Sequence, residues 1–171
     1  MLKIFRRFAS IVAPSKSYFD QSIAVSVGGL KAKQNVAIMA QASVKDVTVT
    51  SIANFTADET GVVSLSNHKA LPGGTYTGIH PMGLFWSMEM TSKLQNPFKM
   101  LSGTKLEKWK YQIGVYDGHA NGIEGALDFF PNQSTIVKTE IERYFVADTC
   151  KRIVVNDGRL RGVLYVPEGL S

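Results

Sequence analysis

Histidine and cysteine are the side chains in this sequence best suited to metal binding or acid-base chemistry. His68, His80 and His119 are widely spaced, and none belongs to a short pair such as His-x-Glu or His-Glu-x-x-His. This spacing does not predict a zinc site. Cys150 is the only cysteine, which excludes an intramolecular disulfide and a thiolate cluster. We interpret His80 and His119 as loop residues that satisfy turn carbonyls, and Cys150 as a partly buried, inert thiol.

A serine nucleophile would need a different signal. On an α/β scaffold it stands in a Gly-x-Ser-x-Gly turn, because only small neighbours fit there. The nearest run is Ala24-Val25-Ser26-Val27-Gly28, which we interpret as an ordinary strand end. The pairs Gly28-Gly29 and Gly73-Gly74 lack the Lys and Ser/Thr, or the third glycine, of a phosphate loop. The sequence therefore predicts no catalytic residue, no metal site and no cofactor in this chain.

The densest aromatic and methionine cluster lies between residues 82 and 88. Such clusters usually belong to a core, although an exposed face would suit contact with another domain or an acyl chain. We predict core packing with part of one face at a domain interface. The candidate interface residues are Met82, Leu84, Phe85, Trp86 and Met88.

The elements that position these residues show a period of two from Gln21 onward. β-Branched and aromatic residues alternate with other residues in 36–44, 108–115 and 137–145. Around Trp109 the apolar and polar positions separate cleanly, which is typical of a strand with one buried face. These stretches predict strands.

Turn residues separate the runs at short intervals. Asn156-Asp157-Gly158 predicts a hairpin that joins 152–155 to 159–166, because glycine supplies the positive φ that tight hairpin turns require. No stretch after Gln21 sustains a long helical pattern, although 88–101 could hold a short helix. Many short strands with frequent turns predict an all-β fold, an immunoglobulin-like β-sandwich.

The first twenty residues differ from the rest in charge. Residues 1–19 contain four basic residues and no acid, so they carry four of the five net positive charges of the chain. On a helical projection the apolar residues of 2–12 occupy one half and the basic residues the other. We interpret 1–20 as a basic amphipathic leader and a candidate mitochondrial presequence. The alternative is a short terminal helix packed on the domain, which we predict to span 21–171.

Length and charge exclude several classes of protein. With 171 residues, one domain is expected. The region after the leader is nearly neutral, and only Lys105, Lys108 and Lys110 gather around an aromatic residue, Trp109. Nucleic-acid binding is therefore not predicted. No window holds the 18 or more apolar residues of a transmembrane helix, so no membrane span is predicted.

Several runs resemble one known family, the acyl-CoA thioesterases grouped with bile acid-CoA:amino acid N-acyltransferase. The most specific is Tyr76-Thr77-Gly78-Ile79-His80-Pro81-Met82-Gly83-Leu84-Phe85-Trp86-Ser87-Met88-Glu89. Further similarity lies in Gly29-Leu30, Val115-Tyr116-Asp117-Gly118-His119, Glu142-Arg143-Tyr144-Phe145 and the run from Arg159 to Pro167. His80 departs from the acidic residue expected before Pro-Met-Gly.

The resemblance implies a two-domain enzyme, in which a β-sandwich precedes an α/β-hydrolase domain with a Ser or Cys, His and Asp triad. The family reaction is hydrolysis of acyl-CoA to fatty acid and CoA, or transfer of the acyl group to an amino acid. The sequence stops at Ser171, before the hydrolase domain is expected, so no family catalytic residue is assigned to any position. We expect a fragment, short isoform or truncated product, inactive alone, in mitochondria or cytoplasm.

Two functions remain open at this point. The chain is either the non-catalytic N-terminal domain that supports the α/β-hydrolase domain, or a stand-alone binding or assembly module. Such a module would recognise acyl-CoA or a full-length relative, with the basic strand around Trp109 meeting the CoA phosphates.

Overall fold

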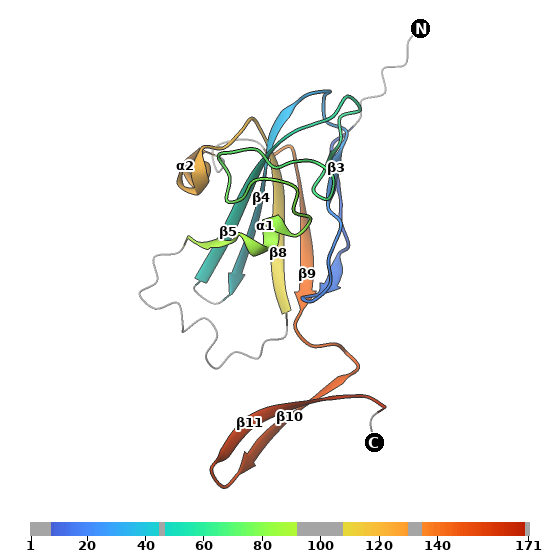
Figure 1. The fold of residues 1–171 in the computed structure, drawn as a ribbon, viewed down its shortest axis with the longest axis vertical. Helices are drawn as coiled ribbons and strands as arrows, with labels where there is room; N and C mark the ends of the chain where they lie inside the picture. The colour runs from blue at the N-terminus through green and yellow to red at the C-terminus, as the bar shows by residue number, and fades with distance from the viewer. Residues whose placement is uncertain (1–7, 45–46, 92–107, 130–134, 170–171) are drawn as a thin grey trace.

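The computed structural model describes residues 8–44, 47–91, 108–129 and 135–169, and the fold is mostly β (Figure 1). A three-stranded antiparallel sheet has the order β1-β3-β6, and a six-stranded sheet has the order β2-β9-β8-β4-β5-β7. The strands of these sheets are β1 (Ser10–Val12), β2 (Lys16–Tyr18), β3 (Ser26–Gly28), β4 (Asn35–Val44), β5 (Val47–Thr56), β6 (Val63–Ser64), β7 (Glu89–Met90), β8 (Lys108–Asp117) and β9 (Val137–Tyr144). We call residues 10–144 the two-sheet body.

The predicted strands are confirmed as β4, β8 and β9. In β8 the side chains of Tyr111, Ile113 and Val115 are buried, and Lys110 and Gln112, on either side of Tyr111, are exposed. β8 pairs antiparallel with β4 on one side and with β9 on the other. The alternation seen in the sequence thus defines which face of the six-stranded sheet turns inward.

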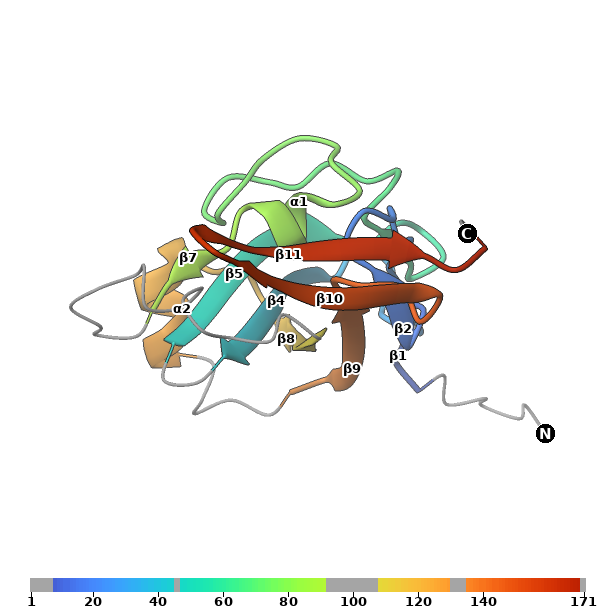
Figure 2. The ribbon, with the colours of Figure 1, turned by 90° about the horizontal axis from the view of Figure 1, so that it is seen from below.

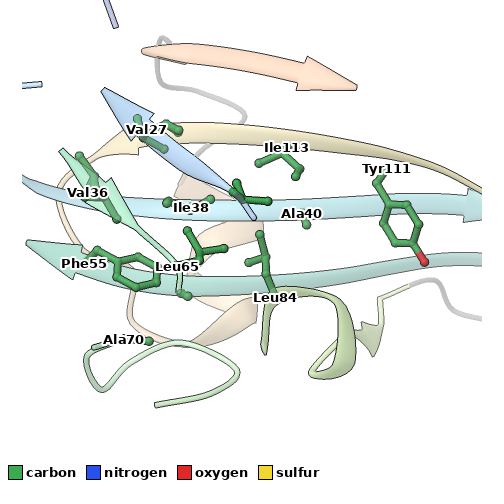
Figure 3. Close-up of a cluster of buried hydrophobic side chains, with 14 of the residues drawn as sticks. Val27, Val36, Ile38, Ala40, Phe55, Leu65, Ala70, Leu84, Tyr111 and Ile113 are labelled. Carbon is green, nitrogen blue, oxygen red and sulfur yellow. The ribbon is translucent and has the colours of Figure 1, made fainter. Parts of the chain in front are cut away.

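The two sheets share one hydrophobic core. Val27 and Val63 of the smaller sheet pack in the same cluster as Val36, Ile38 and Ile113 of the larger sheet. Figure 3 shows Val27, Val36, Ile38 and Ile113 in this cluster together with Leu65 and Leu84. Each fully buried aliphatic side chain contributes about 1.5–3 kcal/mol relative to an exposed one, so this core is the main source of stability.

Arg143 is the one charged side chain among the buried residues of the described structure, with 2% of its surface exposed. Its Nη2 atom donates to the backbone carbonyls of Tyr18, Phe19 and Gln21 at 2.8–2.9 Å. The guanidinium also lies over the rings of Phe19 and Phe85, with its central carbon 5.3 and 5.1 Å from the centroids. The Arg143 side chain therefore links residues 18–21 to β9. β2 itself pairs with β9 in parallel.

The N-terminal helix considered from the sequence is not formed in the described part of that segment. Ser10–Val12 pair with β3, and Lys16–Tyr18 pair with β9. Both strands gain backbone partners in existing sheets, and this long-range pairing outweighs the local helical pattern. Residues 1–7 lie outside the described residues.

Two short helices were not predicted. α1 (Gly83–Trp86) has four residues, and α2 (Gly122–Phe129) follows a turn at Asn121. Ala126 of α2 packs with Ala37 and Ile52 on the outer face of the six-stranded sheet. The short helix considered for 88–101 is wrong at its start, because Glu89–Met90 form the edge strand β7, and residues 92–101 lie outside the described residues.

The predicted hairpin is confirmed, and it lies outside the two-sheet body (Figure 1). β10 (Cys150–Asp157) and β11 (Leu160–Pro167) pair along their whole length in a separate two-stranded sheet. Gly158, with φ of 53°, provides the turn. Seen from below in Figure 2, the hairpin lies across the end of the body. No helix among the described residues is long and apolar enough to cross a membrane.

We predict that Arg143→Met lowers the free energy of unfolding by about 3 kcal/mol, because buried carbonyls lose their charged donor. Arg143→Lys should lose slightly less, since an ammonium group keeps the charge without the planar fork. Urea denaturation monitored by tryptophan fluorescence measures both changes. Arg152→Met, at an exposed arginine of β10, is the matched control and should leave the value unchanged. A loss of the same size in the control would contradict the assignment.

Candidate functional site

The candidate interface is built around α1, which contacts β4 and β5 of the larger sheet. The chain turns sharply there: Gly83 N donates to His80 O at 2.9 Å, and Ser87 N donates to Gly83 O at 3.0 Å. Gly83 lies directly under the ring of Tyr76, where an added Cβ would come within 2.4 Å of a ring carbon. Burial raises the pKa of Tyr76 to about 12. Glycine is required here by close packing.

Met82 and Leu84 point into the core. Met82 is 3% exposed, and its Sδ accepts a hydrogen bond from Ile23 N at 3.3 Å. Leu84 is fully buried (Figure 3), and its carbonyl accepts a hydrogen bond from the hydroxyl of Ser51 in β5. These two residues of the predicted interface therefore hold α1 against the body, and no partner can reach them in this structure.

Phe85 and Met88 are half-buried against the same core. The ring of Phe85 meets the edge of Tyr111 with a centroid distance of 5.3 Å. Trp86 differs from both, because it is 74% exposed. Among the five predicted residues, Trp86 is thus the one with a large surface free for contact in this structure.

The second family-like run, Glu142-Arg143-Tyr144-Phe145, is divided between the two faces of β9. Glu142 accepts a hydrogen bond from Lys108 Nζ at 2.8 Å and from the hydroxyl of Tyr144 at 2.6 Å, and Lys110 Nζ lies 3.6 Å away. These donors lower the pKa of Glu142 to about 2. The hydrogen bond to Glu142 in turn raises the pKa of Lys108.

The contacts of Glu142 account for the lysines of the predicted basic strand around Trp109. Lys108 and Lys110 are both paired with Glu142 across the β8–β9 ladder. Trp109 faces the other way, with its ring centroid 5.7 Å from those of Phe19 and Phe145. Lys105 lies outside the described residues. The two described lysines serve strand pairing, and Trp109 covers the edge of the core.

The remaining chemistry-bearing residues do not converge. His119 Nε2 donates to the carbonyl of Phe55 in β5 at 3.0 Å, and His68 Nδ1 accepts from Ser64 N at 3.0 Å. Cys150 is half-buried at the start of β10, in an apolar hollow that includes Phe145 and Tyr165. Within the described ranges, no three His, Cys, Asp or Glu side chains gather in a way that could hold a metal ion.

Comparison with known protein sequences identifies the family of this chain, which its side chains alone do not. The family model described as the acyl-CoA thioester hydrolase/BAAT N-terminal region matches residues 20–157. Bile acid-CoA:amino acid N-acyltransferase of Mus musculus is 35% identical over 164 residues, which cover 91% of this chain and 36% of that protein. The Homo sapiens protein of the same name is 33% identical over 159 residues, with the same coverage.

A thioesterase is also among the relatives. Acyl-coenzyme A thioesterase 2, mitochondrial, of Rattus norvegicus is 30% identical over 159 residues, which cover 92% of this chain and 32% of that protein. The chain therefore spans about a third of the length of these relatives.

We predict that Gly83→Ala lowers the free energy of unfolding by about 1–3 kcal/mol, because the new methyl group forces the Tyr76 ring out of its place. Gly125→Ala is the matched control: Gly125 lies in α2, and nothing stands within 4 Å of its added Cβ. This control should stabilise the protein by up to about 1 kcal/mol, the helix propensity difference. Thermal unfolding of both variants measures the contrast, and equal effects would contradict the packing argument.

We also predict an acid-sensitive contribution from Glu142. Its folded pKa of about 2 lies below its ordinary value near 4.5, so the carboxylate stabilises the fold above pH 4.5. The contribution declines as the pH falls from 4.5 towards 2, since protonation then favours the unfolded chain. Glu142→Gln should flatten the stability profile in this window. Glu124→Gln, at an exposed glutamate of α2, should leave the profile as it is.

Proposed function

Because this chain belongs to the acyl-CoA thioester hydrolase/BAAT N-terminal region family, we propose that it is the non-catalytic β domain that supports an α/β-hydrolase domain acting on acyl-CoA. One observation carries this proposal. The most specific family-like run, 76–89, and a second run, 142–145, are used for packing and strand pairing, through Gly83 under Tyr76 and through the Arg143 hydrogen bonds.

The roles that we propose for the two domains follow from the chemistry of thioesters. In the hydrolase domain a nucleophile would attack the thioester carbonyl, and an oxyanion hole would stabilise the tetrahedral intermediate while CoA leaves. Water or an amino acid would then accept the acyl group. This chain would contribute a rigid surface, and the exposed Trp86 is the first contact that we assign to it, since large exposed aromatic side chains are enriched at interface hot spots.

The finer fold class and the location are parts of the same proposal. The two packed sheets support an immunoglobulin-like β-sandwich. For location we propose mitochondria or cytoplasm, and the similarity to the mitochondrial thioesterase of rat supports the former. Because residues from 10 onward form β1 and β2, any presequence that leaves the fold intact would end before residue 10.

A chimera tests the support role. Residues 1–171 replace the matched third of the rat thioesterase, and release of CoA from a long-chain acyl-CoA is followed with a thiol reagent. We expect the chimera to be soluble and active, and the unmatched part of the rat protein alone to be about tenfold or more less active. Equal activity without this chain would overturn the proposal, as would hydrolysis by the 171 residues alone.

A separate variant tests the interface contact that we assign to Trp86. Trp86→Ala in the chimera should lower the midpoint of thermal inactivation, because a buried interface aromatic is lost, by an amount equivalent to about 2 kcal/mol. Phe8→Ala is the matched control, since Phe8 is 85% exposed and has no assigned contact. Equal effects of the two changes would remove Trp86 from the interface.

The alternative, a stand-alone acyl-CoA binding module, is not favoured by the pairing of Lys108 and Lys110 with Glu142. Chemical-shift changes in β8 on adding acyl-CoA to the isolated chain would reverse this preference.

A further inference from the structure

The outer face of the six-stranded sheet carries a hollow over β4, β8 and β9. Its volume is about 350 Å³, at the lower end of the range of about 300–1,000 Å³ that is typical of small-molecule sites. α2 covers a neighbouring part of the same face, where Ala126 packs with Ala37 and Ile52 (Figure 1). The hollow is thus a part of the outer face that α2 leaves open.

A glycine lies at the centre of the hollow. Gly114 is in the middle of β8, and its register partners are Met39 in β4 and Lys138 in β9. Pairing continues through Gly114 on both sides, so this glycine does not mark a bulge. Glycine weakens the interior of a strand, and it often marks a position where another group approaches the backbone closely. Its missing side chain leaves a gap between Met39 and Lys138.

The gap has apolar walls. The Tyr116 side chain reaches back over Gly114, where an added Cβ would come within 2.9 Å of a Tyr116 ring carbon and 3.0 Å of its hydroxyl oxygen. Met39 lines the side of β4. Both side chains also pack against the cluster beneath α2, which holds them in place. A flat ring and an adaptable thioether suit an apolar ligand.

The polar side chains of the hollow leave one positive charge without an ion pair. Along the β8–β9 ladder, Gln112 Nε2 donates to Glu140 Oε1 at 3.2 Å, and Lys110 Nζ lies 3.6 Å from Glu142. Lys138 faces the glycine instead, and it makes no ion pair with any residue that the structure describes. Its row therefore lacks both a negative charge and an apolar side chain.

A ligand that completes this row has a carboxylate beside an apolar body. The carboxylate would accept a charge-assisted hydrogen bond from Lys138 Nζ, and the body would lie over Gly114 between Met39 and Tyr116. A volume of about 350 Å³ holds about a dozen non-hydrogen atoms if each takes the roughly 30 Å³ of a water molecule. The hollow is therefore too small to enclose a long fatty acyl chain.

We propose that this hollow on the outer face of β4, β8 and β9 binds a small organic carboxylate, with the carboxylate at Lys138 and an apolar body over Gly114. The inference goes beyond the proposed function and does not rest on it. α1, which carries Trp86, packs its Leu84 into the core on the inner side of the same sheet, so the hollow and the proposed domain contact use different faces.

Three probes separate the two halves of the ligand. The complete chain, labelled with ¹⁵N, is titrated with 3-phenylpropionate, with 3-phenylpropanol, which lacks the charge, and with acetate, which lacks the body. We expect saturable amide shift changes in 39–41, 112–116 and 138–140 with 3-phenylpropionate. The other two probes should bind about tenfold or more weakly, because each loses one contact. Equal binding of either, or no saturable change with 3-phenylpropionate, would overturn the inference.

Variants of the chain test the two positions. Lys138→Gln should weaken binding of 3-phenylpropionate by about tenfold and leave that of 3-phenylpropanol unchanged, because only the acid uses the charge. Lys31→Gln, at an exposed lysine outside the hollow, is the matched control and should bind like the parent. Gly114→Ala should also weaken binding, because its methyl group displaces the Tyr116 ring.

A thermal unfolding curve shows whether Gly114→Ala folds, and if it does not, Lys138→Gln alone decides. Unchanged affinity in Lys138→Gln, or in a folded Gly114→Ala, would overturn the inference. That result would leave Gly114 with a purely structural role, as room for the Tyr116 ring.

A side chain of a partner protein could offer the same chemistry, so a last titration separates the two sources. A dipeptide of phenylalanine and glutamate, blocked at both ends, should bind more weakly than 3-phenylpropionate, because the hollow is too small for its backbone. Tighter binding of the dipeptide would identify a protein partner and overturn the small-molecule assignment. None of these titrations uses the chimera, so failure of either proposal leaves the other standing.

Discussion

The arrangement of the two-sheet body depends on a buried guanidinium. The charge of Arg143 is in contact with three backbone carbonyl oxygens and with the faces of two aromatic rings, and the Asp20 carboxylate adds an electrostatic attraction. Arginine suits this position because its charge is delocalised, weakly hydrated and directed along a planar fork. Without these donors the chain between Tyr18 and Gln21 would present buried, unpaired carbonyls, and β2 would be held to β9 by backbone pairing alone.

The run 142–145, which begins on the same strand, has a structural role for each of its residues. Alternation places Glu142 and Tyr144 on one side, where they bond to each other and to Lys108, and Arg143 on the other. Phe145 then stacks on Phe19, with ring centroids 3.8 Å apart. Every residue of the run has a structural partner. Replacing any of them would disturb strand pairing or the rim of the core.

The sequence was most informative where burial follows the period of the strand. The strands β4, β8 and β9 and the hairpin were predicted because Ile113 or Ile141 must turn inward once their neighbours turn outward. The ten-residue strand β5 was not predicted, because it is buried at successive positions and does not alternate. β1 was missed because a short apolar run fits a helix and a strand equally well, and β2 was missed because its partner strand is more than a hundred residues away. α2 was missed because Gly122 and Gly125 weaken the helical pattern. The candidate interface was only partly resolved, since a four-residue helix is too short to show which side Leu84 and Trp86 face.

The parallel pairing of β2 with β9 also sets an order for synthesis. Residues 16–18 leave the ribosome early, but their partner strand spans 142–144, so the pairing must wait for most of the chain. Contacts this distant in sequence form slowly, because the loop that they close costs entropy before it gains any bond. During translation β2 therefore lacks its partner strand until β9 is made. A chaperone would find β2 accessible in the nascent chain, although the finished fold pairs it with β9.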